Sequence, residues 1–207
     1  MTRREHWDRI YGKASPEGVS WYRPHLERSI EFIEGARLAK DAAILDVGAG
    51  PSTLVDDLLE RGYENVTVLD ISRAALVTAR ERLGARAARV TWIEGDITEL
   101  ELPPSAYDFW HDRAVFHFLN QPDARRRYIS AVRRALKPAG HIVVATFGHA
   151  GPETCSGLDV MRYDAEELHG AFGGEFTKIS GATEIHTTPW GSQQEFVYCY
   201  CRMSAIT

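Results

Sequence analysis

ILDVGAGPST, residues 44–53, is an apolar run that leads through two glycines into the start of a helical pattern. Gly48 and Gly50 have no side chain, so the backbone there can bend sharply and approach a ligand closely. The helix start that follows offers backbone N–H groups without intrahelical partners. This order of strand, glycine turn and helix is typical of open α/β sheets that bind ligands at the carboxyl ends of their strands. A Gly-x-Gly pair alone is weak evidence, because many such pairs are only tight turns.

The chain after Ala42 alternates short apolar runs with longer segments of helical period, which indicates a parallel sheet flanked by helices. The pattern predicts strands over residues 43–47, 66–69, 90–93, 107–110 and 141–146, and helices over residues 24–36, 53–61, 73–83, 123–136 and 165–172. A cation, a proline and a glycine within residues 137–140 are signals that end the fourth of these helices. Two alternating runs, 176–186 and 195–202, predict an antiparallel hairpin that closes the sheet.

The composition argues against several classes of protein. A net charge of −5 disfavours nucleic acid as a partner, and the run at residues 125–127 is interpreted as a solvated helix face. Three cysteines do not make a disulfide framework, which favours a reducing compartment. The N-terminal segment lacks the apolar core of a signal peptide, and no apolar run approaches the length of about 18 residues that a membrane span needs. We therefore expect a cytoplasmic protein without a membrane or nucleic-acid partner.

Acidic residues follow the first strands of the predicted sheet. Asp70 ends the second strand, 20 residues beyond Gly50, where a carboxylate can accept hydrogen bonds from both ribose hydroxyls of an adenosine. On this evidence NAD and S-adenosylmethionine fit equally well. Asp96 follows the third strand, where it could contact an adenine amino group or serve only as a turn or helix-cap residue.

Two features favour S-adenosylmethionine over a dinucleotide. Thr53 occupies the place of the third glycine in the Gly-x-Gly-x-x-Gly pattern of dinucleotide sites. Asp46 puts a carboxylate just before the turn, where it would repel a pyrophosphate. S-adenosylmethionine has no phosphate and carries an ammonium and a sulfonium, so an acidic cleft attracts it.

These segments together resemble the motifs of the class I S-adenosylmethionine-dependent methyltransferases. The matching segments are residues 45–50, 69–72, 95–97, 107–110 and 136–140. The resemblance implies an α/β fold with a Rossmann-like, seven-stranded, mostly parallel sheet, an antiparallel C-terminal hairpin strand and helices on both faces. No long linker divides the chain, so we predict one domain over residues 1–207. It would comprise an N-terminal helical cover over residues 1–40, a cofactor-binding core over 42–147 and an acceptor-side segment with the closing hairpin over 148–207.

The same resemblance implies S-adenosylmethionine as the cofactor. The Gly48–Gly50 loop would lie against its methionine part and Asp70 would hold the ribose hydroxyls. Ile71 and Ile97 would enclose the adenine, and Asp96 would meet the adenine amino group. The full set of expected cofactor-binding residues is Trp21, Asp46, Gly48, Ala49, Gly50, Asp70, Ile71, Ser72, Asp96, Ile97 and Asp112.

Catalytic candidates lie in and after the fourth strand. Methyl transfer requires the nucleophile, the methyl carbon and the sulfur in line, and an oxygen, nitrogen or sulfur acceptor must also lose a proton. We predict that His111, Asp112 and His117 supply or orient a base, because histidine titrates near neutrality. The alternative is that His117 only packs and Asp112 only binds the cofactor ammonium. Cys155 is a candidate reactive group or ligand for a soft element, or neither, and no metal-ligand spacing stands out.

The acceptor remains open between two classes. No Asn-Pro-Pro-Tyr signature of amino-group methylation on nucleic acid follows the fourth strand. Four aromatic residues between positions 7 and 22 are typical of a pocket wall or of a packed N-terminal helix. We predict a small-molecule acceptor, with a protein lysine as the alternative on the same scaffold. A non-catalytic S-adenosylmethionine-binding protein and an NAD-dependent oxidoreductase are the readings from other classes.

Overall fold

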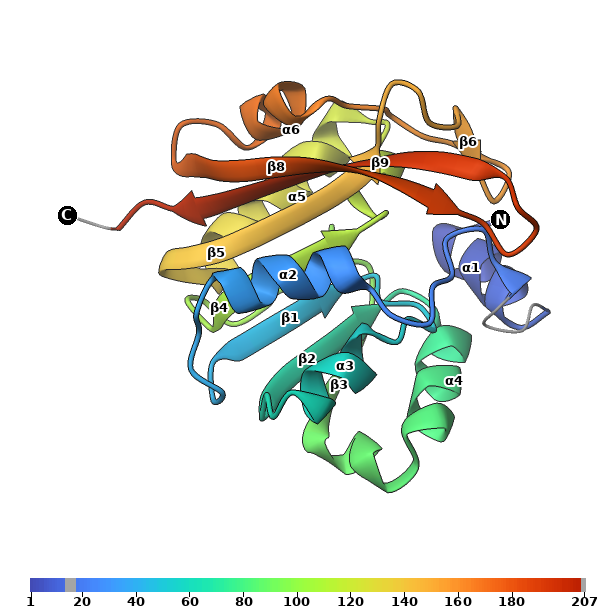
Figure 1. Ribbon diagram of the computed structural model, residues 1–207, viewed down its shortest axis with the longest axis horizontal. Helices are drawn as coiled ribbons and strands as arrows, with labels where there is room; N and C mark the ends of the chain where they lie inside the picture. Colours follow the sequence, from blue (N-terminus) through green and yellow to red (C-terminus); the bar gives the residue numbers. More distant parts are fainter. Residues whose placement is uncertain (14–17, 206–207) are drawn as a thin grey trace.

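The computed structural model describes residues 1–13 and 18–205, so residues 14–17 of the predicted N-terminal cover and residues 206–207 lie outside the described part. The described residues form a seven-stranded sheet in the order β3-β2-β1-β4-β5-β9-β8 (Figure 1). Strands β1 to β5 run parallel, and β9 is antiparallel to both of its neighbours. The predicted mostly parallel sheet with one reversed strand is therefore confirmed. The strand bounds are β1 Ala43–Val47, β2 Asn65–Asp70, β3 Val90–Glu94, β4 Tyr107–Arg113, β5 Leu136–Phe147, β8 Phe176–Thr187 and β9 Gln193–Met203.

Helices cover both faces of the sheet, as predicted. Figure 1 shows α2 in front of the sheet and α5 behind it. Residues of α2 (Glu27–Gly35), α3 (Leu54–Glu60) and α4 (Arg73–Leu83) belong to one buried apolar cluster, and those of α5 (Pro122–Ala135) and α6 (Ala165–Phe172) to the other. Helix α1 (Arg3–Tyr11) packs against α4. Short elements complete the fold: the 3-10 helices η2 (Gly84–Arg89) and η3 (Phe116–Phe118), and the small hairpin of β6 (Thr154–Cys155) and β7 (Leu158–Asp159). Within the described residues, no helix is both long and apolar enough to cross a membrane.

The first four strands end at the same edge of the sheet. Val47 pairs with Leu69 of β2 and with Asp112 of β4, and Leu69 pairs with Ile93 of β3. The backbone N–H of Gly48 donates to the Leu69 carbonyl at 2.7 Å, which holds the glycine turn against the end of β2. Every residue of β1 is buried, as expected for a central strand of a parallel sheet covered on both faces. The carboxyl ends of four strands therefore meet at one edge, where open α/β sheets bind their ligands.

The start of β5 differs from the sequence prediction. The strand begins at Leu136, five residues before the expected position, because Leu136 is buried and pairs with Tyr107 of β4. The next partners are His141 and Phe109, so residues 137–140 bulge out of the ladder. Helix α5 ends at Ala135, one residue before the predicted end, and the chain passes directly into β5, so residues 137–140 lie in the strand and not in the last turn of the helix.

Candidate functional site

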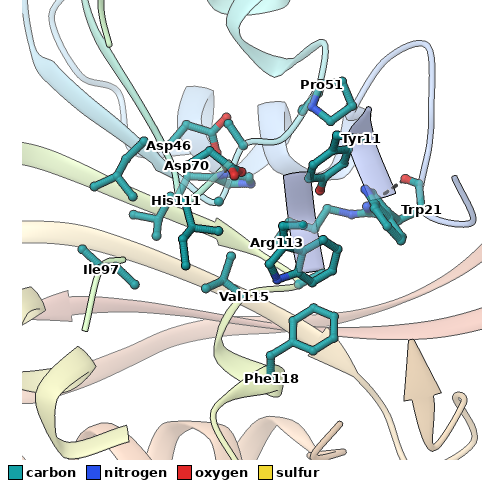
Figure 2. A pocket seen from close by; sticks show the side chains of 18 of the residues that line it. Tyr11, Trp21, Asp46, Pro51, Asp70, Ile97, His111, Arg113, Val115 and Phe118 are labelled. Atoms are coloured by element: carbon teal, nitrogen blue, oxygen red, sulfur yellow. Dashed lines mark hydrogen bonds and ion pairs between the residues drawn. The ribbon is translucent and has the colours of Figure 1, made fainter. Parts of the chain in front are cut away.

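A pocket opens at the carboxyl ends of β1 to β4, and residues of α1 and of the segment that leads into α2 also line it (Figure 2). The space between its walls, including the part that is open to solvent, is about 1110 Å³. Figure 2 shows the Asp46, Asp70 and His111 side chains gathered together, with Tyr11 and Trp21 across the cavity from them. Of the predicted site residues, the pocket wall contains Trp21, Asp46, Gly48, Ala49, Asp70, Ile71, Asp96, Ile97 and His111.

The glycine turn forms part of the wall and has no space for side chains. Gly48 and Gly50 have φ angles of +62° and +56°, in the left-handed region that glycine adopts most easily. A Cβ atom on Gly48 would overlap the side chain of Val115, and one on Gly50 would lie 2.9 Å from the hydroxyl oxygen of Tyr11. Backbone and not side chain therefore faces the cavity at this turn.

Asp70 lies at the centre of the acidic wall. Its two carboxylate oxygens accept the backbone N–H groups of Gly50 and Ser72, each at 2.7 Å. Burial raises the pKa of this carboxyl to about 6, although the two N–H donors act in the opposite direction. Each carboxylate oxygen has a second acceptor position, so Asp70 can still accept bonds from a ligand. Gly50 and Ser72 do not line the pocket, and they contribute by orienting Asp70.

Helix α1 is attached to this wall by polar contacts. The Ser72 hydroxyl donates to Asp8 at 2.6 Å, and an N–H of Arg3 donates to Asp96 at 3.2 Å. The other oxygen of Asp96 accepts the backbone N–H and the hydroxyl of Thr98, so Asp96 stabilises the turn after β3 and also lines the pocket. The predicted turn role of Asp96 is therefore observed, and its place in the pocket wall leaves the contact with an adenine amino group as a prediction.

His111 is held in a buried chain of hydrogen bonds. One ring nitrogen, Nδ1, lies 2.7 Å from Oδ1 of Asp46, and the other, Nε2, lies 2.8 Å from the hydroxyl of Ser29 in α2. All three side chains are buried. Both ring nitrogens of His111 are therefore engaged by the protein. The second oxygen of Asp46, Oδ2, is buried and has no hydrogen-bond partner among the described residues, which suits contact with a cationic ligand.

Asp112 does not line the pocket. Its carboxylate accepts the backbone N–H groups of Val115 and Phe116, at 2.9 and 3.1 Å, and the hydroxyl of Tyr128 at 2.5 Å. Burial raises its pKa to about 6. The carboxylate stabilises the turn into η3, and the predicted cofactor-binding and catalytic roles do not follow from this position.

His117 does not line the pocket either. Its Nδ1 accepts the backbone N–H of Phe147 at 3.3 Å, and its ring packs against Phe118 and Phe147. Burial lowers its pKa to about 3, so the ring is neutral near pH 7. This position corresponds to the packing alternative and not to a base beside the acceptor.

Aromatic rings form the wall opposite the acidic residues. Trp7 lies within 5.1 to 6.0 Å, between ring centroids, of Tyr11, Trp21 and Phe118. Cys155 also lines the pocket, and burial raises the pKa of its thiol to about 11. The thiol is therefore protonated near neutral pH, which argues against its use as a nucleophile or as a ligand for a soft element.

Several residues of this site carry no signal in the sequence. Ser29 lies on a predicted helix, but nothing in its neighbourhood marks it as a partner of His111. Arg113 follows two candidate residues and lines the pocket, yet a single arginine in a strand has no motif around it. The contacts of α1 join residues 64 or more positions apart, which local patterns do not encode.

Comparison with known proteins gives the family. A sequence model described as "Methyltransferase domain" matches residues 44–140. The chain is similar to malonyl-[acyl-carrier protein] O-methyltransferase of Paenibacillus sp. (strain JDR-2), with 29% identity over 184 residues, which are 86% of this chain and 63% of that protein. It is also similar to EEF1A lysine methyltransferase 2 of Danio rerio, with 24% identity over 161 residues, which are 69% of this chain and 67% of that protein. The chain thus spans less than two thirds of the bacterial relative.

The fold is shared with a solved structure from work on the conversion of a disulfide bond into a thioacetal group during echinomycin biosynthesis. That structure aligns over 100% of this chain and 94% of its own, with a TM-score of 0.79 and 20% identity. The sheet order, the glycine turn and the acidic pocket thus define a Rossmann-like methyltransferase fold. Residues 44–140 match the methyltransferase family model, and the fold is that of the class I S-adenosylmethionine-dependent methyltransferases, whose methyl donor is S-adenosylmethionine.

Proposed function

We propose that this protein transfers the methyl group of S-adenosylmethionine to an oxygen, nitrogen or sulfur nucleophile of a small molecule. The observation that carries the proposal is the position of Asp46, Asp70 and Asp96 around one cavity, at the ends of three neighbouring strands. A cavity with three carboxylates at this edge suits a ligand that has a ribose and positive charge but no phosphate.

The pocket residues divide naturally between the parts of the cofactor. Asp70 would accept the ribose hydroxyls, Ile71 and Ile97 would enclose the adenine, and Asp96 would accept from its amino group. The backbone at Gly48 and Ala49 would lie against the methionine part. Trp21 would cover that part, and the free oxygen of Asp46 would face positive charge. These assignments use the donors, acceptors and apolar surfaces that line the cavity, and they extend the sequence expectations residue by residue.

The contribution to catalysis would be alignment and exclusion of water. When bound, S-adenosylmethionine would supply a methyl group on a sulfonium: the acceptor atom would bond to the methyl carbon as the carbon–sulfur bond breaks, and S-adenosylhomocysteine would leave. The aromatic wall of Trp7, Tyr11, Trp21 and Phe118 would keep water from this position and hold the acceptor in line. We do not assign a general base to Asp112 or His117, since neither reaches the cavity. The remaining role for His111 is to fix the orientation of Asp46.

A small molecule is favoured over a protein lysine because the cavity is covered. Helix α1 and Trp21 lie over it, and α1 is tied down through Asp8 and Arg3. A lysine of a folded protein needs an open groove that leads to the methyl group. Because the three cysteines are free thiols and are buried, a cytoplasmic location suits the protein. The whole chain would act as one domain, with residues 1–40 as its cover.

Calorimetric titration with S-adenosylmethionine, S-adenosylhomocysteine and NAD tests the cofactor. We expect the first two to bind and NAD not to bind; NAD binding alone would overturn the proposal and favour a dinucleotide enzyme. Release of S-adenosylhomocysteine is then measured with small-molecule acids, phenols, thiols and amines, and with protein mixtures. Turnover on proteins alone would favour the lysine reading, and cofactor binding without turnover on any acceptor would favour a non-catalytic binding protein.

A further inference from the structure

Arg113, the last residue of β4, places its guanidinium in the pocket wall on the side of β9. Its Nε–H donates to the hydroxyl of Tyr198 at 3.2 Å, and an Nη1–H donates to the carbonyl of Trp21 at 3.1 Å. The guanidinium carbon lies 4.1 Å from the ring centroid of Phe196. Figure 2 shows Arg113 beside Trp21 and Val115. The side chain is thus fixed by β9 and by the N-terminal segment, and only 9% of the residue is exposed.

The positive charge of Arg113 is not neutralised within the described part of the chain. No carboxylate of these residues lies within ion-pair distance of its guanidinium. Arg113 is connected to a carboxylate only indirectly, through the Tyr198 hydroxyl, which donates to Glu184. Glu184 already forms an ion pair with Arg23. A buried charge without a counter-ion costs far more free energy than a paired one, so an arginine in this position indicates an anionic ligand.

The unused hydrogen-bond donors of Arg113 point to the same conclusion. A guanidinium has five N–H donors, and the described residues accept two of them. Nη2 is buried and has no partner among these residues. A planar carboxylate can take two neighbouring donors of a guanidinium at once, which gives both attraction and orientation.

We propose that Arg113 binds a carboxylate of the methyl acceptor, so that the acceptor is a small organic acid. This proposal rests on the proposed function and names its substrate class. The methionine carboxylate of the cofactor is the competing partner, because Trp21, whose carbonyl Arg113 contacts, would cover that part. We assign the guanidinium to the acceptor because Asp46, Asp70 and Asp96, which suit the cofactor, belong to the β1 to β3 side of the pocket, and the S-adenosylhomocysteine affinity of Arg113→Met tests this assignment. Arg113 instead contacts β9, which lies beyond β5 on the other side of β4. A carboxylate suits this site better than a phosphate dianion, since its single negative charge balances the single positive charge of Arg113.

The surroundings of Arg113 also indicate what the rest of the acceptor is like. The pocket beside the guanidinium is lined by the rings of Trp7, Trp21 and Phe118. Aromatic walls of this kind bury planar or apolar groups. The acceptor class is therefore a carboxylic acid with an aromatic or apolar body. The same cation would repel the ammonium group of a lysine.

The proposal is tested on the full chain saturated with S-adenosylhomocysteine. Benzoate and phenylacetate are compared with the uncharged benzamide and phenylacetamide by ligand-observed NMR. We expect the acids to bind about tenfold tighter than the matched amides, which is the effect of one charge-assisted hydrogen-bonded contact. Arg113→Met should abolish this preference and Arg113→Lys should retain part of it. Arg202→Met is the matched control, because Arg202 is exposed and its side chain forms one hydrogen bond among the described residues, to the Ala139 carbonyl.

Four outcomes would overturn the proposal. Equal affinity for acids and amides, or no binding of any acid, would remove the carboxylate site. Phenyl phosphate binding more tightly than benzoate would replace carboxylate by phosphate. A fall of about tenfold or more in S-adenosylhomocysteine affinity in Arg113→Met would assign the arginine to the cofactor. Failure of the wild-type protein to bind S-adenosylhomocysteine would instead refute the proposed function itself, which keeps the two failures distinct.

Discussion

Replacement of Asp70 by Asn tests the centre of the cofactor site with almost no change in shape. In the wild-type protein both oxygens of Asp70 accept backbone N–H groups, from Gly50 and Ser72. The Asn side chain has one oxygen and one NH₂ group, so its NH₂ must face one of these two donors. The substitution also removes the negative charge and one of the two acceptors available to a ribose.

The expected loss of affinity follows from these changes. A hydrogen bond to a charged group contributes about 1.5–3 kcal/mol, and one between neutral groups contributes about 1 kcal/mol. Losing one charged bond and weakening the other costs about 2–4 kcal/mol, which corresponds to a roughly 30-fold to 1,000-fold weaker Kd for S-adenosylhomocysteine.

The assay is calorimetric titration of Asp70→Asn with S-adenosylhomocysteine at neutral pH, with thermal unfolding to show that the variant is folded. Asp56→Asn is the control, since Asp56 pairs with Arg82 and Arg86 outside the pocket wall. The control should bind with wild-type affinity. A folded Asp70→Asn protein whose Kd stays within about threefold of the wild type would refute the role of Asp70 in holding the ribose.

Three further predictions concern the glycine turn and two buried titrating groups. Gly48→Ala should lower Tm and weaken S-adenosylhomocysteine binding at least about tenfold, because of its positive φ and its overlap with Val115; Val115→Ala in the same protein should recover part of the Tm. The wild-type affinity for S-adenosylhomocysteine should fall as pH decreases through about 6, where Asp70 gains a proton, and Asp70→Asn should lose this dependence in the same titrations. The pKa of His117 is about 3 in the folded protein and 6.5 in the unfolded chain. Below pH 6.5 the unfolded chain therefore gains a proton that the folded protein does not, and the free energy of unfolding should fall by up to about 1.4 kcal/mol per pH unit, whereas above pH 6.5 this effect is absent. Urea unfolding at several pH values should show a shallower decline in His117→Phe.

The sheet and the cofactor side of the site could be predicted because their signals are local. A strand buried on both faces is a continuous apolar run, and β1 was predicted with its observed ends. The carboxyl ends of parallel strands meet at one edge, so an acid that follows β2 or β3 must lie near the turn after β1. Gly48 and Asp70 line the pocket for this reason.

The catalytic candidates were chosen by nearness in sequence, and the alternation of β4 separates them. Successive residues of a strand face opposite sides of the sheet. His111 and Arg113 lie on the α2 side and line the pocket, while Asp112 lies between them and contacts Tyr128 of α5. The two-residue alternation of this strand predicts that His111 and Arg113 share one face of the sheet and that Asp112 lies on the other face, away from the pocket. The partner of His111, Ser29, required the packing of α2 on the sheet, which no local pattern gives.

The pocket carries opposite charges at its two ends, and this arrangement connects the proposed reaction with the proposed acceptor. Asp46 and Asp70 attract a cofactor whose sulfonium is positive, and Arg113 attracts an acid. Each end alone has a buried charge or polar atom without a partner among the described residues, such as Oδ2 of Asp46 and Nη2 of Arg113. Each ligand would satisfy one of them and would place its charge where it attracts the other ligand. An acid should therefore bind more tightly to the protein that holds S-adenosylmethionine than to the protein that holds S-adenosylhomocysteine, whose sulfur is uncharged. The loss of this attraction after methyl transfer would favour release of the methylated product.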